Sequence, residues 1–158
     1  MLINFKKVLI VILTVVAGSL FLSNQASPDS LLFGVKRLQE KVFMNISQTP
    51  EKKVDYYMSL LDKRLEEIDY LVKNKQSNYL WSASLRYSTS AGEISKLIVD
   101  NNLTSYASKA ITKFKSHQIV LKNLDETFPN HYNVEEWKYL QDDSNYIDLY
   151  INQLSQIQ

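Results

Sequence analysis

Residues 49–72 read TPEKKVDYYMSLLDKRLEEIDYLV, and this stretch decides the fold. The Thr49 hydroxyl can cap a helix, Pro50 suits the first helical position, and Glu51 places negative charge at the positive helix end. Apolar residues then recur at helical spacing on one side and polar residues on the other. The apolar face is Val54, Tyr57, Met58, Leu61, Leu65, Ile68 and Val72, and the opposite side carries Lys53, Arg64 and Glu67.

Three further amphipathic helices are predicted, over about residues 79–100, 104–124 and 134–156. A breaker at 127–131 separates the last two. Their predicted core faces are Leu80, Tyr87, Ala91, Ile94 and Ile98, then Ala107, Ala110, Phe114, Leu121 and Leu124, then Trp137, Leu140, Ile147, Ile151 and Leu154. Three glycines and three prolines are too few for a β protein with many tight turns. The predicted fold class is all-α, an N-terminal helix followed by a bundle of about five helices in antiparallel hairpins.

A shorter helix is predicted to precede residue 49. Pro28, with Asp29 or Ser30 as the N-cap, marks its start. Its predicted core seam consists of Val35, Leu38, Val42 and Ile46, which are spaced three, four and four residues apart.

Residues 1–26 have the order of an export signal: Lys6-Lys7, an apolar run over 8–22 and a small polar end. At about 1.5 Å per residue, the apolar run is short for a hydrocarbon core of about 30 Å, which favours a cleaved signal peptide. An uncleaved membrane anchor remains the alternative. Both interpretations place residues 27–158, predicted to be one domain, outside the cytoplasm.

Charge and composition exclude several classes of protein. Two of the 18 basic residues lie in 1–26, so 27–158 holds 16 basic and 17 acidic side chains, a net charge of about −1. This balance gives no electrostatic reason to bind nucleic acid. The absence of cysteine excludes disulfides, thiolate metal sites and cysteine nucleophiles.

The last two predicted helices carry opposite charge. The helix over 104–124 has four lysines and no acid, and the helix over 134–156 has a net charge of −4. The two are therefore expected to pack antiparallel. The four lysines are split between the two sides of the apolar stripe, with Lys109 and Lys113 on one side and Lys115 and Lys122 on the other. We interpret them as side chains whose apolar stems cover the edges of the core. The alternative is a basic patch that binds an anionic envelope polymer.

Two further patterns have a structural and a functional interpretation. Small residues beside the core face of 79–100, namely Ser84, Ser88, Gly92 and Ser95, indicate close helix packing or else a partner-binding groove. Tyr139, Tyr146 and Tyr150 form a stripe on the last helix, which is interpreted as packing at the core edge or else as a surface for sugars or a protein partner.

No pattern in the sequence predicts a catalytic, cofactor or metal site. The histidines are His117, at the edge of an apolar face, and His131, in a predicted turn. His117 has no metal-ligand residue four positions away. The adjacent acids are expected on solvated faces, because neighbours on a helix point about 100° apart: Glu66-Glu67, Glu135-Glu136 and Asp142-Asp143.

Two motifs follow one another in the first part of the chain. PDSLLFGVKRLQEKV at 28–42 is followed by TPEKK at 49–53 and by a helix that contains Leu61, Arg64, Leu65 and Glu67. Together they resemble a bacterial family of exported helical domains catalogued only as a domain of unknown function, over about residues 28–100. Gly34 stands where many members have proline. The resemblance implies an extracytoplasmic bundle, often beside a membrane segment, and implies no reaction, ligand or site residue.

These observations predict a non-enzymatic, extracytoplasmic helical interaction module of the bacterial cell envelope. Its expected partners are an envelope protein and, if residues 1–26 are retained, the membrane. The alternative is an envelope sensor that binds a metal ion or small ligand through clustered acids and His117 or His131. Nothing in the sequence indicates the oligomeric state.

Overall fold

A computed structural model of the chain describes residues 9–10, 13–15, 17–18, 21–22, 26, 30, 32–46, 49–127 and 135–157. Every regular element in these ranges is a helix, so the all-α prediction is confirmed. The chain divides into two compact units, Met1–Ile46 and Ser47–Gln158. The predicted boundary after residue 26 concerns export, and it stays a prediction.

The first unit contains helix α2, Phe33–Ile46. Ser30 caps its start, because its hydroxyl accepts from the amide of Leu32 (3.2 Å) and its carbonyl from the amide of Phe33 (3.0 Å). Pro28 and Asp29 lie outside the described residues. The predicted core seam is wrong at Leu38 and Val42, which are 65% and 48% exposed. Helical periodicity identifies an apolar face, but it does not show whether another element covers that face.

Among the described residues, no helix has both the length and the apolar composition needed to cross a membrane. Much of the segment 1–26 lies outside those residues, including Lys6 and Lys7. The predicted signal peptide or anchor therefore stays a prediction.

Helix α3, Pro50–Lys73, begins as predicted. Pro50 opens the helix, and the Thr49 hydroxyl accepts a long hydrogen bond (3.4 Å) from the amide of Lys52. Two residues after the end of the helix, Lys75 has a left-handed backbone conformation (φ 56°), and the amide of Gln76 then donates to the carbonyl of Leu71. This is a Schellman ending, which turns the chain back sharply.

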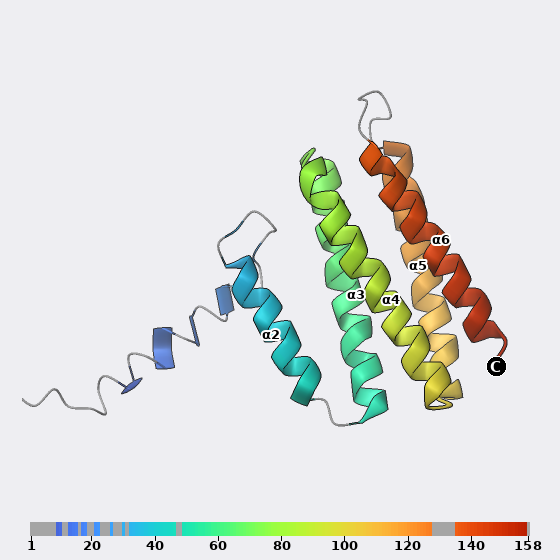
Figure 1. Ribbon diagram of the computed structural model, residues 1–158, viewed down its shortest axis with the longest axis horizontal. Coiled ribbons are helices and arrows are strands. Elements are labelled where there is room, and N and C mark those ends of the chain that lie inside the picture. The colour runs from blue at the N-terminus through green and yellow to red at the C-terminus, as the bar shows by residue number, and fades with distance from the viewer. Residues whose placement is uncertain are drawn as a thin grey trace, which may run out of the picture. The chain divides into compact units, whose positions relative to one another are not determined.

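Three further helices, α4, α5 and α6, complete the second unit. The 3₁₀ turn η1, Ser77–Tyr79, leads into α4, Leu80–Asp100, and α5 spans Thr104–Thr127. After residues 128–134, which lie outside the description and include most of the predicted breaker, η2, Glu135–Trp137, leads into α6, Lys138–Ser155. Figure 1 shows α3 to α6 side by side, alternating in direction.

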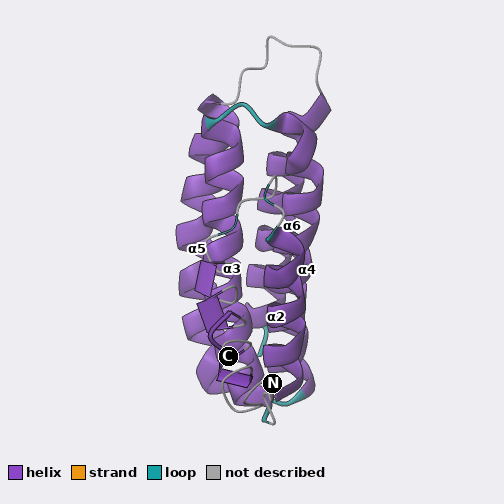
Figure 2. Cartoon of the chain, turned by 90° about the vertical axis from the view of Figure 1, so that its left-hand side faces the viewer, coloured by secondary structure: helices purple, strands orange, loops and turns teal. Residues whose placement is uncertain are grey.

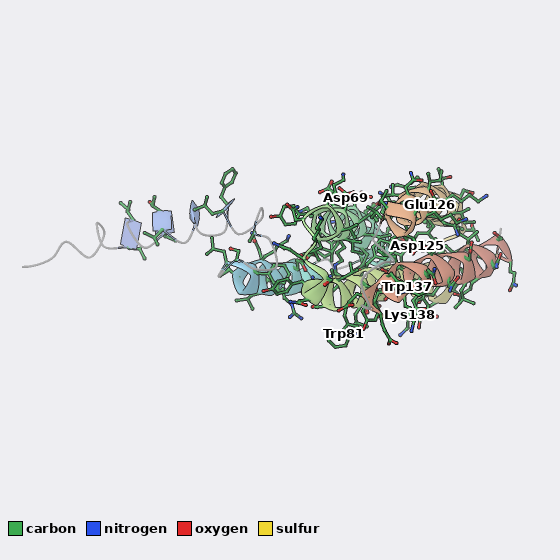
Figure 3. All side chains as sticks on the ribbon, turned by 90° about the horizontal axis from the view of Figure 1, so that it is seen from above. Asp69, Trp81, Asp125, Glu126, Trp137 and Lys138 are labelled. Carbon is green, nitrogen blue, oxygen red and sulfur yellow. The ribbon has the colours of Figure 1, made fainter. Side chains whose placement is uncertain are left out.

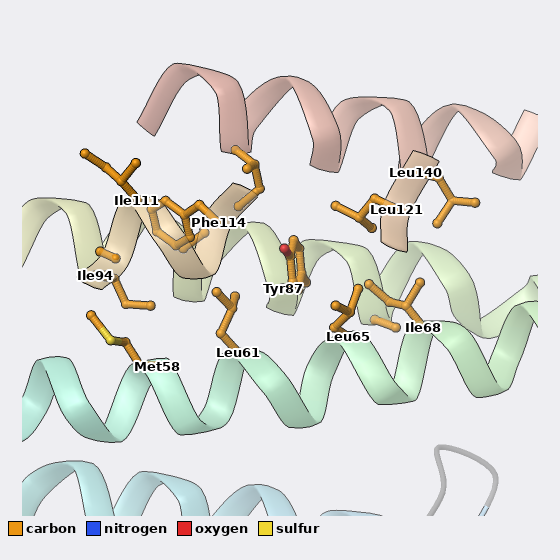
Figure 4. Packing of buried hydrophobic residues seen from close by; sticks show 14 of the residues in the cluster. Met58, Leu61, Leu65, Ile68, Tyr87, Ile94, Ile111, Phe114, Leu121 and Leu140 are labelled. Atoms are coloured by element: carbon orange, nitrogen blue, oxygen red, sulfur yellow. The ribbon is translucent and has the colours of Figure 1, made fainter. Parts of the chain in front are cut away.

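The core of the second unit lies between these four helices (Figure 4). Tyr87 and Phe114 are its largest fully buried side chains. Every residue predicted for the core faces of 79–100 and 104–124 is buried, whereas Trp137 and Ile151 on the last helix are only partly buried. The periodicity of the sequence therefore predicted which faces of α4 and α5 point inward.

The antiparallel pairing of α5 and α6 is confirmed. The expected attraction between lysines of α5 and acids of α6 is not seen among the described ion pairs. The described links run from Gln118 to Asp148 (2.5 Å) and from Gln141 to Asp125 (3.2 Å). Lys109 and Lys113 instead pair with acids of α3. Lys115 and Lys122 are exposed, and the interpretation of the four lysines as cover for core edges stays a prediction.

Parallel helices α4 and α6 meet through small side chains. Ser84 donates to the carbonyl of Tyr139 (3.3 Å), Ser95 donates to Gln153 (2.9 Å), and Gly92 faces Tyr150. This confirms the close-packing interpretation of the small residues. Figure 2 shows the arrangement from the side, with α3 and α5 together and α4 and α6 together.

Candidate functional site

The seam between α3 and α5 contains an open groove with a volume of about 480 Å³. From α3 it is lined by Asp62, Leu65, Glu66 and Asp69, and from α5 by Ser116, His117 and Val120. In Figure 3, Asp69 lies on this side of the second unit, and Trp81 of α4 lies on the opposite side. The groove is the candidate functional site.

The groove follows from how the four helices pack. Small residues let α4 and α6 approach closely, whereas long polar side chains bridge α3 and α5. Asp55 accepts from Lys109 (2.8 Å) and from the Tyr106 hydroxyl (3.3 Å) near one end of the seam. Farther along, the carboxylate of Asp62 accepts from Lys113 through both oxygens, at 2.5 and 2.6 Å. Ion pairs therefore span a seam that apolar packing does not fill.

A chain of hydrogen bonds runs from the groove into the core. Asp62 Oδ1 lies 2.9 Å from His117 Nε2, and His117 Nδ1 lies 3.2 Å from the hydroxyl of Tyr87. Since a carboxylate only accepts, His117 donates from Nε2, and its Nδ1 accepts the Tyr87 proton. His117 is 6% exposed and Tyr87 is fully buried. The chain fixes the side chain of Asp62 at the groove.

Burial sets the protonation of the two inner groups. It lowers the pKa of His117, and the bonded carboxylate of Asp62 offsets only part of that effect. Burial also raises the pKa of Tyr87, with the charges of Asp143 and Asp62 adding to the rise. His117 is therefore neutral and Tyr87 protonated at neutral pH, so neither offers a charged nucleophile or a cationic acid to the groove.

The described residues contain no group of three or more His, Asp or Glu side chains arranged to hold a metal ion. His131 lies outside the described residues. What the groove offers is a set of carboxylates beside an apolar floor. This chemistry suits the binding of a cation that carries apolar atoms.

A second polar cluster joins α3 to α4 and corrects the prediction for Arg64 and Glu67. Glu67 is 8% exposed and pairs with Arg86 (2.6 Å), which also donates to Ser82 (2.7 Å). Arg64 donates to the carbonyl of Arg86 and to the Ser90 hydroxyl. Both residues lie beside α4. This helix covers part of the α3 face that the sequence pattern marks as exposed to solvent.

The prediction of solvated faces is also wrong for Asp143, which is 1% exposed. Neither of its carboxylate oxygens has a hydrogen-bond partner among the described residues. Burial raises its pKa to about 8, and the neighbouring charge of Asp142 adds to the rise. Asp143 is therefore mainly in its neutral, protonated form at pH 7.

The three tyrosines of α6 do not form one exposed surface. Tyr146 is 48% exposed and stacks on Tyr150, with ring centroids 6.4 Å apart. Tyr150 is half-buried against the core, 6.4 Å from the ring of Phe114, and Tyr139 is also partly buried. These contacts support the packing interpretation for Tyr150, and a recognition role for the stripe stays a prediction.

Sequence reasoning found His117 but missed its partners. Asp62 was visible as an acid between Leu61 and Leu65 on the apolar side of α3, and Lys113 and His117 are one turn apart on α5. An acid beside the apolar stripe of one helix, and a Lys and His one turn apart beside the stripe of another, indicate an ion pair between the two helices. Only the arrangement of the helices shows that the two face each other.

Comparison with known protein families identifies the family of this chain. Residues 25–131 match the family described as Domain of unknown function (DUF5667). The chain belongs to the DUF5667 family. This confirms the resemblance to a family of unknown function. No curated protein and no solved structure matches the chain.

The DUF5667 match divides the candidate sites. It covers α2 to α5, and so it contains every residue that lines the groove, as well as Tyr87 and Lys113. Helix α6, with Asp143 and the three tyrosines, follows the matched residues. The groove thus belongs to the DUF5667 region, while the tyrosine stripe lies beyond it.

Proposed function

We propose that this DUF5667 protein is a non-enzymatic interaction module of the bacterial cell envelope, held outside the cytoplasm, which binds another protein through the α3/α5 groove. The observation that carries the proposal is the groove itself, where Leu65 and Val120 lie beside the carboxylates of Glu66 and Asp69. An open surface with apolar contacts and charged edges has the anatomy of a protein interface.

The location outside the cytoplasm is supported by residues 1–26. Two lysines, an apolar run and a small polar end are the features by which export signals and N-terminal anchors are recognised. The composition agrees, since a unit with an apolar core of this size needs no disulfide to fold in an oxidising compartment.

The non-enzymatic role is supported by how the groups in the groove are engaged. Both ring nitrogens of His117 have hydrogen-bond partners, and the Tyr87 hydroxyl lies in the core. A general base must reach the proton that it removes from a substrate. His117 is instead held between Asp62 and Tyr87, as expected for a residue that positions its neighbours.

Single cysteines in this cysteine-free chain test location and contact together. Ser116→Cys places a thiol in the groove, and Thr89→Cys places one on α4. The two sites are matched, because each is an exposed helical hydroxyl that bonds back to its own helix. Cells that produce the full chain are treated with a membrane-impermeant maleimide, and the labelling rates are compared with those of purified protein.

We expect Thr89→Cys to be labelled in intact cells, because the domain is outside the cytoplasm. Ser116→Cys should be labelled more slowly in cells than after purification, because the partner covers the groove. Absence of labelling at both positions would contradict the location. Equal protection at both positions, or none at Ser116→Cys, would contradict the groove as the contact face.

The alternative, a sensor of a metal ion or small ligand, uses the same groove. Thermal-shift screening of the purified chain with divalent metals and cell-wall fragments separates the two functions. A rise in melting temperature that is lost in Glu66→Gln would favour the sensor.

A further inference from the structure

We infer that the α3/α5 groove binds a lysine or arginine side chain of its partner protein, with the cationic head at Glu66 and the apolar stem over Leu65 and Val120. This inference rests on the proposed function and names the chemistry of the partner. It follows from the charge, the floor and the size of the groove.

The carboxylates of the groove are unequally engaged. Asp62 is paired with Lys113 and His117, and Asp69 is paired with Lys73 (2.7 Å) on its own helix. Glu66 is exposed and has no hydrogen bond or ion pair among the described residues. Since His117 is neutral, the groove retains one uncompensated negative charge, which favours a visiting cation and disfavours an anion.

The floor beside Glu66 is apolar. Leu65 is 7% exposed and Val120 is half-buried, so both have packed side chains with one side turned to the groove. A lysine or arginine stem can cover such a surface while its charged head stays at the solvated edge. An ion without apolar atoms would leave this floor uncovered.

The geometry disfavours a bare metal ion as the occupant. A volume of about 480 Å³ is much larger than one ion requires, and the described residues form no cluster of three metal ligands. Glu66 and Asp69 lie three residues apart on α3, so their carboxylates line the same edge of the groove as neighbours. Such an edge can receive a side chain that projects from a partner segment.

The test uses the full ¹⁵N-labelled chain in a non-ionic detergent and three synthetic peptides. The probe is acetyl-Gly-Leu-Lys-Leu-Gly-amide. In the two controls, norleucine or glutamate replaces the lysine, so that one control removes only the ammonium group and the other reverses the charge. Amide shifts at Leu65, Glu66, Ser116 and Val120 locate the binding, and titration gives the dissociation constants.

We expect the lysine peptide to shift the groove amides, and we expect the norleucine peptide to bind about two- to fivefold more weakly, as exposed ion pairs allow. Glu66→Gln should remove this preference. Asp100→Asn, an equal charge change at an exposed position at the end of α4, should keep it.

The inference is overturned if the lysine peptide leaves the groove amides unshifted, if it binds no better than the norleucine peptide, or if the glutamate peptide binds equally well. If the groove thiol is protected in cells while the peptides show no cationic preference, the contact face stands and only the chemistry of the partner is wrong. An unprotected groove thiol would instead contradict the proposed function.

Discussion

The hydroxyl oxygen of Tyr150 lies 2.9 Å from the position that a Cβ atom on Gly92 would occupy. The next ring atom, Cζ, is 3.3 Å from the same point. Gly92 thus makes room for a half-buried ring of α6 at the α4/α6 contact. This contact is close, and the α3/α5 seam on the other side is open.

A double-mutant cycle tests this contact. Alanine in a helix interior is favoured over glycine by up to about 1 kcal/mol, but at Gly92 the Tyr150 hydroxyl opposes the gain. Gly92→Ala should therefore be more favourable in a Tyr150→Phe background than in the wild type, by about 0.5–1 kcal/mol. Urea denaturation followed by circular dichroism measures the four variants. Equal effects in both backgrounds would show that Tyr150 does not restrict Gly92.

Substitution of the adjacent acids Glu66 and Glu67 should have very different effects on stability. Glu67→Gln leaves Arg86 without its charged partner in a largely buried pair, and it should cost about 3–5 kcal/mol of unfolding free energy. Glu66→Gln changes an exposed side chain without a described partner and should stay within about 0.5 kcal/mol. Chemical denaturation of both variants gives the comparison. Similar losses for the two would contradict the placement of Glu67 beside α4.

The contrast between Glu66 and Glu67 shows which features of the structure can be predicted from the sequence. Periodicity and capping predict α3 and the buried faces of α4 and α5, because those depend on a single helix and its apolar side. Glu67 and Asp143 are buried by a neighbouring helix, so a polar residue off the apolar stripe gives no local sign of its burial. The groove depends on two seams of unequal width, and only the assembled helices define it.

Asp143→Asn should stabilise the protein at neutral pH. The pKa of Asp143 is about 8 in the folded state, against an ordinary value of 3.8. Between these two pH values, the folded state therefore holds a proton that the unfolded chain has released. The unfolding free energy therefore falls as pH rises through this interval, and Asn removes that fall. The gain at pH 7 is on the order of 2–4 kcal/mol. Asp100→Asn, an equal charge change at an exposed position on α4, is the control. A flat pH profile in the wild type would contradict the account.

His117 gives the opposite slope in acid. Its pKa is lowered in the folded state, so the unfolded chain binds protons more readily, and stability present above pH 6.5 is lost as pH falls below that value. His117→Gln should flatten this loss. Asp62→Asn should steepen it, because the Asp62 carboxylate supports the protonated ring. Denaturation between pH 5 and 8 measures the slopes, with an NMR titration of the imidazole for the pKa. A raised His117 pKa would refute this prediction.

Site-specific photocrosslinking in living cells tests most directly whether the α3/α5 groove is the contact face. A benzophenone amino acid is placed at Ser116 in the groove or at Thr89 on α4, and the adducts of the full chain are compared after irradiation. The account predicts a discrete protein adduct from position 116 that is absent from position 89 and weakened by Glu66→Gln. Equal adducts from both positions, or none from position 116, would contradict it.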